Sequence, residues 1–593
     1  MKAIRPLEKS IICIVMLGLA IFMLPSGRAQ GIEKVSFQHP WMVFGEQNFP
    51  DKPVRGGYYR TAAAKHVGLM NPNHWPVNDW NVITYLYEEI YFNDGDLKPS
   101  VPWLAESHEY TDPTTVIMKL REGIRFHDGT EFNAESVKVQ IEWIMNKKNG
   151  CWTKAWLEPI ESVEVIDAYT VKWNFKHPWA AFFGTLANIP GYMMSTKALQ
   201  AEEALKKLKM LKKRIKTYKK KVKKKGRKSD RKKLAKAEKE HRKWQARAEG
   251  AHSLDTHPIG TGQYILEDSS PGNYTRLKRN PDWWFGQAIG HPDMPYFDGK
   301  EVLVIPDPSV QLANLRVAKI HEMTVDKSMV RLLKDDPQFN MYTYPSAHVQ
   351  LLVFNHAKGP CRDIRVRKAI SHAIDRKALI WGTQFGLGRA ASCLFPDNHW
   401  SHNQELKPVS YDPALSRKLL AEAGFADGLT IKGGMGSSVR ESVLTEAVKG
   451  MLSKVGIDWE VNLLDAAAAA DKMRNLEYDV GGARWEYIYD PDASLTGLYH
   501  PNGGFNYGRS RNKRVISLIE AGRRELIPSK RQKIYRTLEK EIYENYEDAW
   551  LWWEIEAIAR SKKVLGINQE LYLLGRESYY MSHPMWFKDG RSK

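Results

Sequence analysis

Cysteine is scarce in this sequence, and the residue patterns of common metal and catalytic sites are missing. Four cysteines occur among 593 residues, and neither they nor the 18 histidines show a zinc-type spacing or an H-E-x-x-H pattern. The segment 260–262 reads Gly-Thr-Gly but has Ile265 where a dinucleotide fingerprint needs its third glycine, so it predicts a tight turn. The adjacent His127 and Asp128 precede a glycine and have no Ser or Cys elbow, so they also predict a turn. The sequence therefore predicts neither an enzyme nor a resident metal or cofactor.

Long apolar runs are absent after the first 24 residues, so no later membrane-spanning helix is predicted. Residues 1–29 have the organisation of a secretory signal, in which an apolar run at 11–24 is followed by small residues that allow cleavage after Ala29. Three basic residues precede the run: Lys2, Arg5 and Lys9. Cys13 follows an isoleucine, which argues against a lipoprotein site, and a retained N-terminal anchor is the alternative to cleavage. We therefore expect export.

Excess charge is confined to one segment. The chain has a formal net charge of +19, and residues 201–250 hold 23 of the 88 Lys and Arg and 6 of the 69 Asp and Glu, a net of +17. The rest of the chain is therefore nearly neutral, and the basic character belongs to a local feature.

Three cysteines remain after export: Cys151, Cys361 and Cys393. An oxidising compartment permits one disulfide, and Cys361 with Cys393 is the nearer pair in sequence. Closing that loop would stabilise the chain by roughly 3–4 kcal/mol in the chain-entropy account. Three buried free thiols are the alternative, because spacing alone does not show that two cysteines are within reach.

Short β-rich segments alternate with helical ones along most of the chain. Residues 116–120 and 171–175 predict strands, whereas Asn133 and Asp363 each precede apolar residues at helical spacing and predict N-caps. This mixture predicts α/β lobes.

Residues 199–252 differ in kind and predict an antiparallel coiled-coil hairpin. Their apolar positions follow alternating three- and four-residue steps: Ala201, Ala204, Leu208, Leu211, Ile215, Tyr218, Val222, then Leu234, Ala237, His241, Trp244 and Ala248. Gly226 suits the end of the first helix, and Ser229 or Asp230 an N-cap of the second. The segment is interpreted either as a solvated insertion or as an arm that meets lipid headgroups, envelope polyanions or an acidic transporter surface.

Several ordered motifs together resemble the extracellular solute-binding proteins of family 5, which serve ABC importers of oligopeptides, dipeptides and nickel. They cover nearly all of the predicted mature chain except 199–252. The motifs are PWLAESHEY (102–110), MKLREGIRFHDGTEFNAESV (118–137), HPIGTGQYIL (257–266), LKRNPDWW (277–284), IPDPSVQLANLRVAKI (305–320), FNHAKGPCRDIRVRKAISHAIDRKALI (354–380), YDPALSRKLLAEAGF (411–425) and RWEYIYDPD (484–492).

The resemblance implies an α/β periplasmic binding protein of type II, with a bilobal three-domain architecture and an inserted hairpin. Lobe closure over a ligand is implied as well, with a hinge where the chain crosses twice between lobes. The implied parts are a signal peptide 1–29, domain I (30–75, 256–344 and 556–593), domain II (76–198), the hairpin 199–252 and domain III (345–555).

By resemblance, the segment 484–492 lines the ligand site of domain III. The residues predicted to contact ligand are Arg484, Trp485, Glu486, Tyr487, Tyr489 and Asp490. Peptide-binding members have an Asp three residues after this Trp to receive the peptide amine, but here that residue is Ile488. The five-residue spacing from Trp485 to Asp490 is similar to the nickel-binding branch. Glu486 or Asp490 could bind a cation, and Arg484 either an anion or a partner within its own domain.

The resemblance implies a periplasmic receptor that captures a peptide or peptide-like molecule and delivers it to the permease of an ABC importer. A non-peptide or metal-chelate ligand is one alternative, and a ligand-gated sensor that docks on a membrane signalling protein is another. We expect a monomer, a possible contact of 201–250 with an anionic envelope surface, and no physiological nucleic-acid partner, because export separates the chain from nucleic acid.

Overall fold

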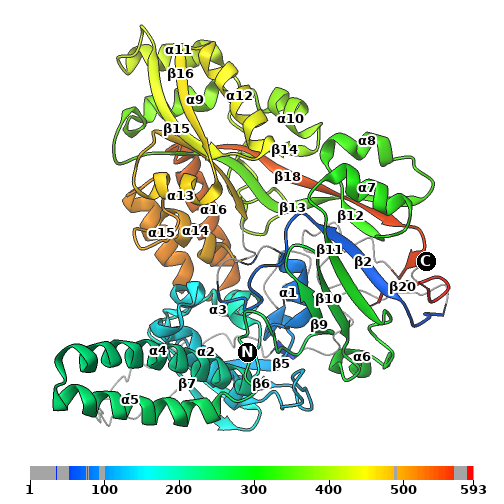
Figure 1. Ribbon diagram of the computed structural model, residues 1–593. Helices are drawn as coiled ribbons and strands as arrows, with labels where there is room; N and C mark the ends of the chain where they lie inside the picture. The colour runs from blue at the N-terminus through cyan, green and yellow to red at the C-terminus, as the bar shows by residue number, and fades with distance from the viewer. Residues whose placement is uncertain are drawn as a thin grey trace, which may run out of the picture.

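The computed structural model describes residues 35–36, 52–74, 77, 79–92, 101–486, 490–566 and 584–591. The predicted signal peptide and its cleavage site at Ala29 lie outside these ranges. The names domain I, domain II and domain III stand for the residue ranges predicted from the sequence. In Figure 1 the range of domain III occupies the top and left, that of domain I the right, and that of domain II the lower part, from which the hairpin extends to one side. Within the described ranges, no helix is long and apolar enough to cross a membrane.

The range predicted as domain II contains four strands of a five-stranded antiparallel sheet of order β1-β5-β6-β8-β7, and the edge strand β1 comes from the range predicted as domain I. The strands of this sheet are β1 (Val35–Ser36), β5 (Ala105–Asp112), β6 (Thr115–Leu120), β8 (Thr170–Phe175) and β7 (Ile160–Asp167). The strands predicted at 116–120 and 171–175 are confirmed as β6 and β8. Helix α2 (Ala134–Met145) packs on β7, and its predicted cap is confirmed because the Asn133 side chain accepts a hydrogen bond from the Ser136 backbone N–H at 3.1 Å.

Domains I and III share one large mixed sheet. Its order is β16-β15-β17-β13-β18-β12-β2-β11-β10-β9, with β14 pairing with β18 at the side. The strands are β16 (Ile457–Leu464), β15 (Leu429–Gly436), β17 (Val480–Glu486), β13 (Phe339–Phe354), β18 (Asp548–Ser561), β14 (Gly388–Ala390), β12 (Glu322–Thr324), β2 (Tyr58–Ala63), β11 (Gly299–Val304), β10 (Tyr274–Arg279) and β9 (Tyr264–Ser270).

Strands β13 and β18 are the two chain segments that run from domain I into domain III (Figure 1). They pair antiparallel, and Pro345 stands opposite Ile555. The two predicted domain crossings, at 344/345 and 555/556, therefore lie side by side. The pairing register shifts between Pro345 and Val349, so the ladder is interrupted next to the crossing. A bend between the lobes would strain fewest ladder hydrogen bonds at this point.

Helices cover both faces of the domain III part of the sheet. Alternate residues of β13 separate the two cores, since Leu352 and Phe354 belong to one cluster and Leu351 and Val353 to the other. The first face is covered by α9 (Ile364–His372), α10 (Arg376–Gln384), α11 (Pro413–Glu422) and α12 (Val439–Ser453). The second is covered by α13 (Ala466–Arg474), α14 (Pro491–Tyr499), α15 (Lys513–Arg524) and α16 (Pro528–Glu544). The cap predicted at Asp363 is confirmed at the start of α9.

The disulfide considered between Cys361 and Cys393 is not formed. Both residues are buried free thiols, as is Cys151, which is the alternative that the sequence left open. Cys361 packs with Leu352 and Phe354, whereas Cys393 packs in the cluster on the other face of β13, so the sheet separates them. Burial raises the thiol pKa of Cys361 and Cys393 above its usual range, so both are protonated.

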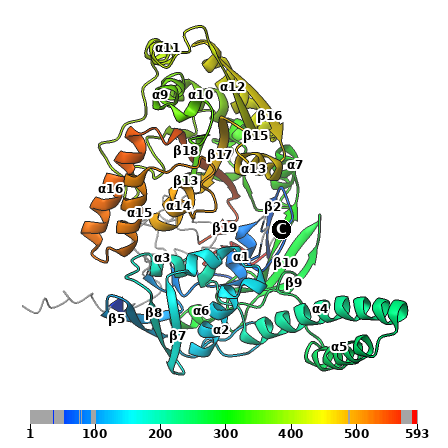
Figure 2. The ribbon, with the colours of Figure 1, turned by 90° about the vertical axis from the view of Figure 1, so that its left-hand side faces the viewer.

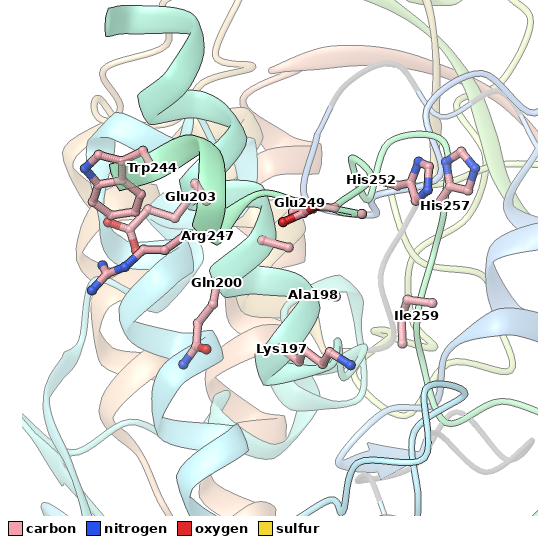
Figure 3. A pocket seen from close by; sticks show the side chains of 14 residues that line it. Lys197, Ala198, Gln200, Glu203, Trp244, Arg247, Glu249, His252, His257 and Ile259 are labelled. Atoms are coloured by element: carbon pink, nitrogen blue, oxygen red, sulfur yellow. The ribbon is translucent and has the colours of Figure 1, made fainter. Parts of the chain in front are cut away.

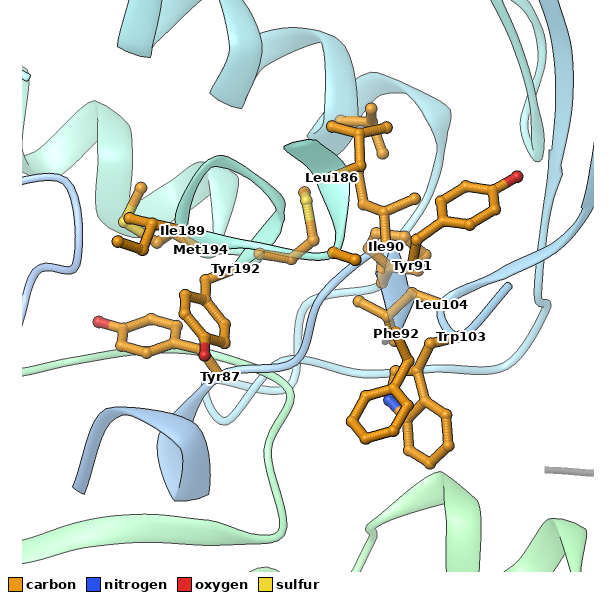
Figure 4. Close-up of a cluster of buried hydrophobic side chains, with 14 of the residues drawn as sticks. Tyr87, Ile90, Tyr91, Phe92, Trp103, Leu104, Leu186, Ile189, Tyr192 and Met194 are labelled. Atoms are coloured by element: carbon orange, nitrogen blue, oxygen red, sulfur yellow. The ribbon is translucent and has the colours of Figure 1, made fainter. Parts of the chain in front are cut away.

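The core shared by domains I and II is rich in aromatic side chains, and part of it is drawn in Figure 4. At its centre the buried Glu88 carboxylate accepts hydrogen bonds from three indole N–H groups: Trp103 at 3.1 Å, Trp283 at 3.0 Å and Trp284 at 3.0 Å. Burial raises the pKa of Glu88 to about 7, although these hydrogen bonds oppose the shift. Trp283 and Trp284 belong to domain I, so this carboxylate joins the two domains.

The smaller elements complete domains I and II. They are α1 (Trp80–Leu86), β3 (Tyr91–Phe92), β4 (Val101–Pro102), α3 (Phe182–Leu186), α6 (Trp284–Ala288), α7 (Pro308–Arg316), α8 (Val330–Leu333), β19 (Val564–Leu565) and β20 (Trp586–Phe587).

The segment predicted as a hairpin contains two helices, α4 (Thr196–Lys225) and α5 (Lys228–Arg247), which pack on each other. Helix α4 ends at Gly226, whose φ of 58° is the left-handed conformation that glycine favours. The N-cap predicted at Ser229 or Asp230 is wrong, because Gly226 and Arg227 link the helices and α5 begins at Lys228. Asp230 lies instead in the first turn, where a carboxylate also stabilises a helix N-terminus. Figure 2 shows this pair of helices projecting away from the rest of the molecule.

Candidate functional site

The segment predicted to bind ligand lies at the end of β17 and the start of α14. Arg484, Trp485 and Glu486 are the last residues of β17. Asp490 caps α14, since its side chain accepts a hydrogen bond from the Asp492 backbone N–H at 3.0 Å. Tyr487 and Tyr489 lie outside the described residues. Helix α14 lies next to α3 of domain II in both ribbon views, so the segment is at the boundary between domains III and II (Figures 1 and 2).

Arg484 is held in an ion pair with Glu554 of β18. Its Nε and Nη2 atoms donate to one Glu554 oxygen at 3.0 and 2.6 Å, and Nη2 lies 3.4 Å from Glu556. Glu554 is fully buried and also pairs with Arg440 at 2.9 Å. Burial alone would raise the pKa of Glu554, but the two guanidinium groups hold it well below its usual range. Of the two roles considered for Arg484, the structure therefore places it in a pair within the sheet.

The ion pair belongs to a cluster in which opposite charges balance. The cluster contains the cations Arg440, Arg484 and Lys327 and the carboxylates Glu486, Glu554 and Glu556. Lys327 Nζ donates to Gln384 Oε1 at 2.8 Å, and burial lowers the pKa of Lys327. His348, opposite Glu486 in the ladder, is neutral because burial lowers its pKa to about 4. The cluster lies where β13, β17 and β18 approach domain I, and it offers charges of both signs without a net excess.

Trp485 points to the opposite face of β17 from Arg484. Its ring packs edge-on against Phe505 with centroids 4.8 Å apart, and it lies at the margin of the core under α14 and α15. It also lines a void of about 30 Å³, which holds at most one water molecule. The indole Nε1 has no hydrogen-bond partner among the described residues. The Trp485 ring is therefore half-buried, and its indole N–H is the one donor of the side chain that the described residues do not satisfy.

Asp490 is engaged at the contact between domains III and II. Its two oxygens accept from Arg531 at 2.6 and 2.8 Å, so the carboxylate is already paired. Gly184 of α3 lies directly against it, because a Cβ added there would be 2.6 Å from the Asp490 Cβ. Nearby, the Ala180 backbone N–H donates to the Arg523 carbonyl at 2.8 Å. The two lobes are therefore in contact in this structure.

Domain II presents aromatic groups beside this contact. Phe183 of α3 packs on His108 with ring centroids 4.0 Å apart and on Tyr110 at 5.8 Å. The Tyr91 hydroxyl hydrogen-bonds to His108 Nδ1 at 2.7 Å, and burial lowers the pKa of His108 to about 4. Burial raises the pKa of Tyr110, and the positive charge of Arg531, across the domain boundary, opposes that shift. None of these residues was predicted from the sequence to belong to the site. His108 and Tyr110 lie at the end of the 102–110 motif, which is the signal that could have indicated them.

A larger pocket, of about 720 Å³, lies at the root of the hairpin (Figure 3). It is lined by Lys197 and Trp244 and by the stacked rings of His252 and His257, whose centroids are 4.2 Å apart. Its charged side chains are exposed and of both signs, and no group of three His, Cys, Asp or Glu able to hold a metal occurs in the described part of the chain. The pocket therefore does not have the converging buried polar groups of a ligand site.

The turn predicted at His127 and Asp128 is confirmed. Both ring nitrogens of His127 face backbone groups of Gly260 and Gly262, at 3.4 and 2.9 Å, and burial lowers its pKa to about 4. Asp128 accepts from the Ser195 hydroxyl at 2.7 Å. The two glycines approach the backbone of Tyr85 and Leu86 too closely for any Cβ. These residues fix a loop and leave no room for a phosphate.

Comparison with known proteins agrees with this geometry. The family model of bacterial extracellular solute-binding proteins, family 5, matches residues 100–506. The glutathione-binding protein GsiB of Escherichia coli O1:K1 is 25% identical over 479 residues, which cover 78% of this chain and 82% of that protein.

Two solved structures share the fold. The oligopeptide-binding protein AppA of Bacillus subtilis, in complex with a nonapeptide, has a TM-score of 0.71 and 19% identity over 90% of this chain and 100% of its own. NikA of Brucella suis, in complex with Fe(III)-EDTA, has a TM-score of 0.72 and 22% identity over the same shares. The family match spans more than half of the chain, and this protein therefore belongs to the bacterial extracellular solute-binding proteins of family 5.

Proposed function

We propose that this protein is the periplasmic receptor of an ABC importer, which captures a peptide or peptide-like molecule by lobe closure and delivers it to the membrane permease. The proposal rests on family membership together with the two-stranded connection between the lobes. The observation that carries it is the contact of Gly184 with Asp490, because it joins the two lobes at a distance from the chain crossings in β13 and β18, where the pairing register shifts.

A zwitterionic ligand suits the charged and aromatic side chains described for the candidate site. The charge cluster around Arg484 and Glu554 is balanced, so it can meet an amine and a carboxylate without leaving one charge uncompensated. Glu486 is its exposed carboxylate, and Phe183 and Tyr110 offer aromatic surface from domain II. Aromatic side chains with a few placed polar groups are the usual lining of small-molecule sites. The relative GsiB is named for glutathione, a peptide-like molecule.

A thermal-shift screen tests the proposal. The panel contains glutathione, dipeptides, tripeptides and longer peptides, with free amino acids and sugars as controls. A ligand that binds only the folded protein raises stability by RT ln(1 + [L]/Kd), about 2.7 kcal/mol at a hundredfold excess over Kd. We expect a peptide or glutathione to raise the melting temperature and to reduce the radius of gyration in small-angle scattering. A response to none of the peptides would refute the peptide assignment.

A metal chelate is the second candidate. Two observations favour it: Ile488 stands where peptide-binding members have an amine-binding Asp, and Asp490 is already paired with Arg531. The same screen with nickel-histidine and ferric EDTA separates the candidates, since a chelate would stabilise the protein while the free metal and the free chelator would not.

A further inference from the structure

The outer part of the hairpin carries a dense positive charge on a protein that is otherwise neutral. Residues 212–236, at the far ends of α4 and α5, contain sixteen Lys and Arg and one acidic residue, Asp230. All sixteen basic residues are exposed. Lys219 forms an ion pair with Glu238 at 3.5 Å, and no other ion pair of these sixteen is present within the described chain. The charge is therefore available to a partner outside the protein.

The root of the hairpin is fixed to domain II, so the charged end has a defined position. Glu202 is buried and accepts a hydrogen bond from the Leu254 backbone N–H at 3.0 Å. Lys206 donates to the Asn149 carbonyl at 3.2 Å and lies 4.8 Å from the centre of the Trp143 ring. Figure 2 shows that the helices then extend away from both lobes. A partner can therefore bind the end of the hairpin without touching the ligand face or hindering closure.

The charged end has no apolar face. Its large apolar side chains, Ile215, Tyr218, Val222 and Leu234, are all half-buried, and the exposed large apolar residue of the hairpin is Met210, outside 212–236. Thirteen of the sixteen basic residues are lysines, which act as point charges and do not need a shaped, bidentate partner. Such a surface fits a laterally mobile layer of negative headgroups better than a structured acidic site.

We propose that residues 212–236 form a docking surface for an anionic lipid bilayer. The exposed lysines lie on both helices and no large apolar side chain of 212–236 is exposed, so binding is electrostatic adsorption to phosphate headgroups without insertion. Adsorption would hold the receptor close to the membrane that carries its permease. The interaction weakens as salt rises, because exposed charges are screened beyond about 8 Å at physiological ionic strength.

Vesicle co-sedimentation tests this proposal. The full chain is compared with a variant carrying Lys220→Gln, Lys223→Gln, Lys224→Gln and Lys228→Gln, in which glutamine keeps the helix propensity of lysine. Vesicles are phosphatidylcholine alone or mixed with phosphatidylglycerol. We expect the full chain to bind only the anionic vesicles, less as salt rises, and the variant to bind them at least tenfold more weakly.

A matched control neutralises four exposed lysines of the body: Lys147, Lys148, Lys334 and Lys513. This control should bind anionic vesicles like the full chain. Equal binding by the hairpin variant and the control, or no binding of the full chain at low salt, would overturn the proposal. Binding to duplex DNA without binding to anionic vesicles would also overturn it, in favour of a nucleic-acid partner. Circular dichroism checks the fold, and an unchanged thermal shift with ligand keeps this result separate from the proposed receptor function.

Discussion

Gly184 offers a substitution that acts on the closed arrangement of the lobes and leaves each lobe intact. It lies in α3 of domain II, and a Cβ added to it would stand 2.6 Å from the Cβ of Asp490 in domain III. Carbon atoms that do not share a bond rest about 3.5–4.0 Å apart, so Gly184→Ala requires the two lobes to separate by roughly 1 Å at this point. An open arrangement has no such requirement.

Gly184→Ala should weaken ligand binding without lowering the stability of the unliganded protein. Overpacking of this kind costs about 1–3 kcal/mol, and the cost falls only on the closed state. Since ligand binding is coupled to closure, the dissociation constant should rise about 5- to 150-fold. Alanine is also the better helix former by up to about 1 kcal/mol, so the unliganded protein should melt at the same temperature or higher.

Isothermal titration calorimetry with the peptide or glutathione identified by the thermal-shift screen measures the first effect, and thermal unfolding measures the second. Gly450→Ala in α12 is the matched control, because its added Cβ would meet nothing within 4 Å. The control should bind like the unaltered protein. If Gly184→Ala binds with unchanged affinity and the loaded protein keeps its radius of gyration, the contact with Asp490 is not part of the ligand-bound state.

Three other substitutions test named contacts. Trp485→Ala should lower the free energy of unfolding by about 2–3 kcal/mol, because the ring packs on Phe505 at the core margin. An unchanged denaturation midpoint would show that the ring does not stabilise the core. Glu88→Gln should flatten the pH dependence of the free energy of unfolding. The buried Glu88 carboxyl, with its pKa raised to about 7, holds its proton more tightly than in the unfolded chain, so stability falls as pH rises from about 4.5 to 7. A variant with the same slope in pH-dependent denaturation would contradict this. Glu554→Ala should cost about 3–5 kcal/mol, because the guanidinium groups of Arg484 and Arg440 both lose this buried carboxylate. Adding Arg484→Ala should recover part of the loss, and denaturation that shows additive losses would rule out the pair.

The sequence predicted best those features whose partners are close along the chain. The cap at Asn133 depends on Ser136, which is only three residues away and therefore within the same helical turn. The seam between α4 and α5 follows a local repeat and ends at a glycine, so both helices could be placed before any fold was known. The N-cap of the second helix was predicted two or three residues too late, because Arg227 takes the N-cap position without a side-chain cap hydrogen bond, which its sequence does not signal.

Contacts between distant residues were beyond sequence reasoning. Arg484 pairs with Glu554, which is 70 residues away, and the Glu88 carboxylate accepts a hydrogen bond from Trp283, which is 195 residues away. Spacing also favoured Cys361 and Cys393 as a pair, although they lie on opposite faces of one sheet. For the ligand segment, the resemblance placed Trp485 and Asp490 in the ligand site of domain III but did not indicate that Arg531 already donates to the Asp490 carboxylate.

Native mass spectrometry of the protein, purified from its own cells without unfolding, tests most directly the claim that the lobes close on a peptide-like molecule. We expect a noncovalent adduct whose mass and fragments identify a peptide or a peptide derivative such as glutathione, and which is lost on mild denaturation. A protein whose only adduct is a metal chelate or a sugar, and which no peptide replaces, would contradict that claim.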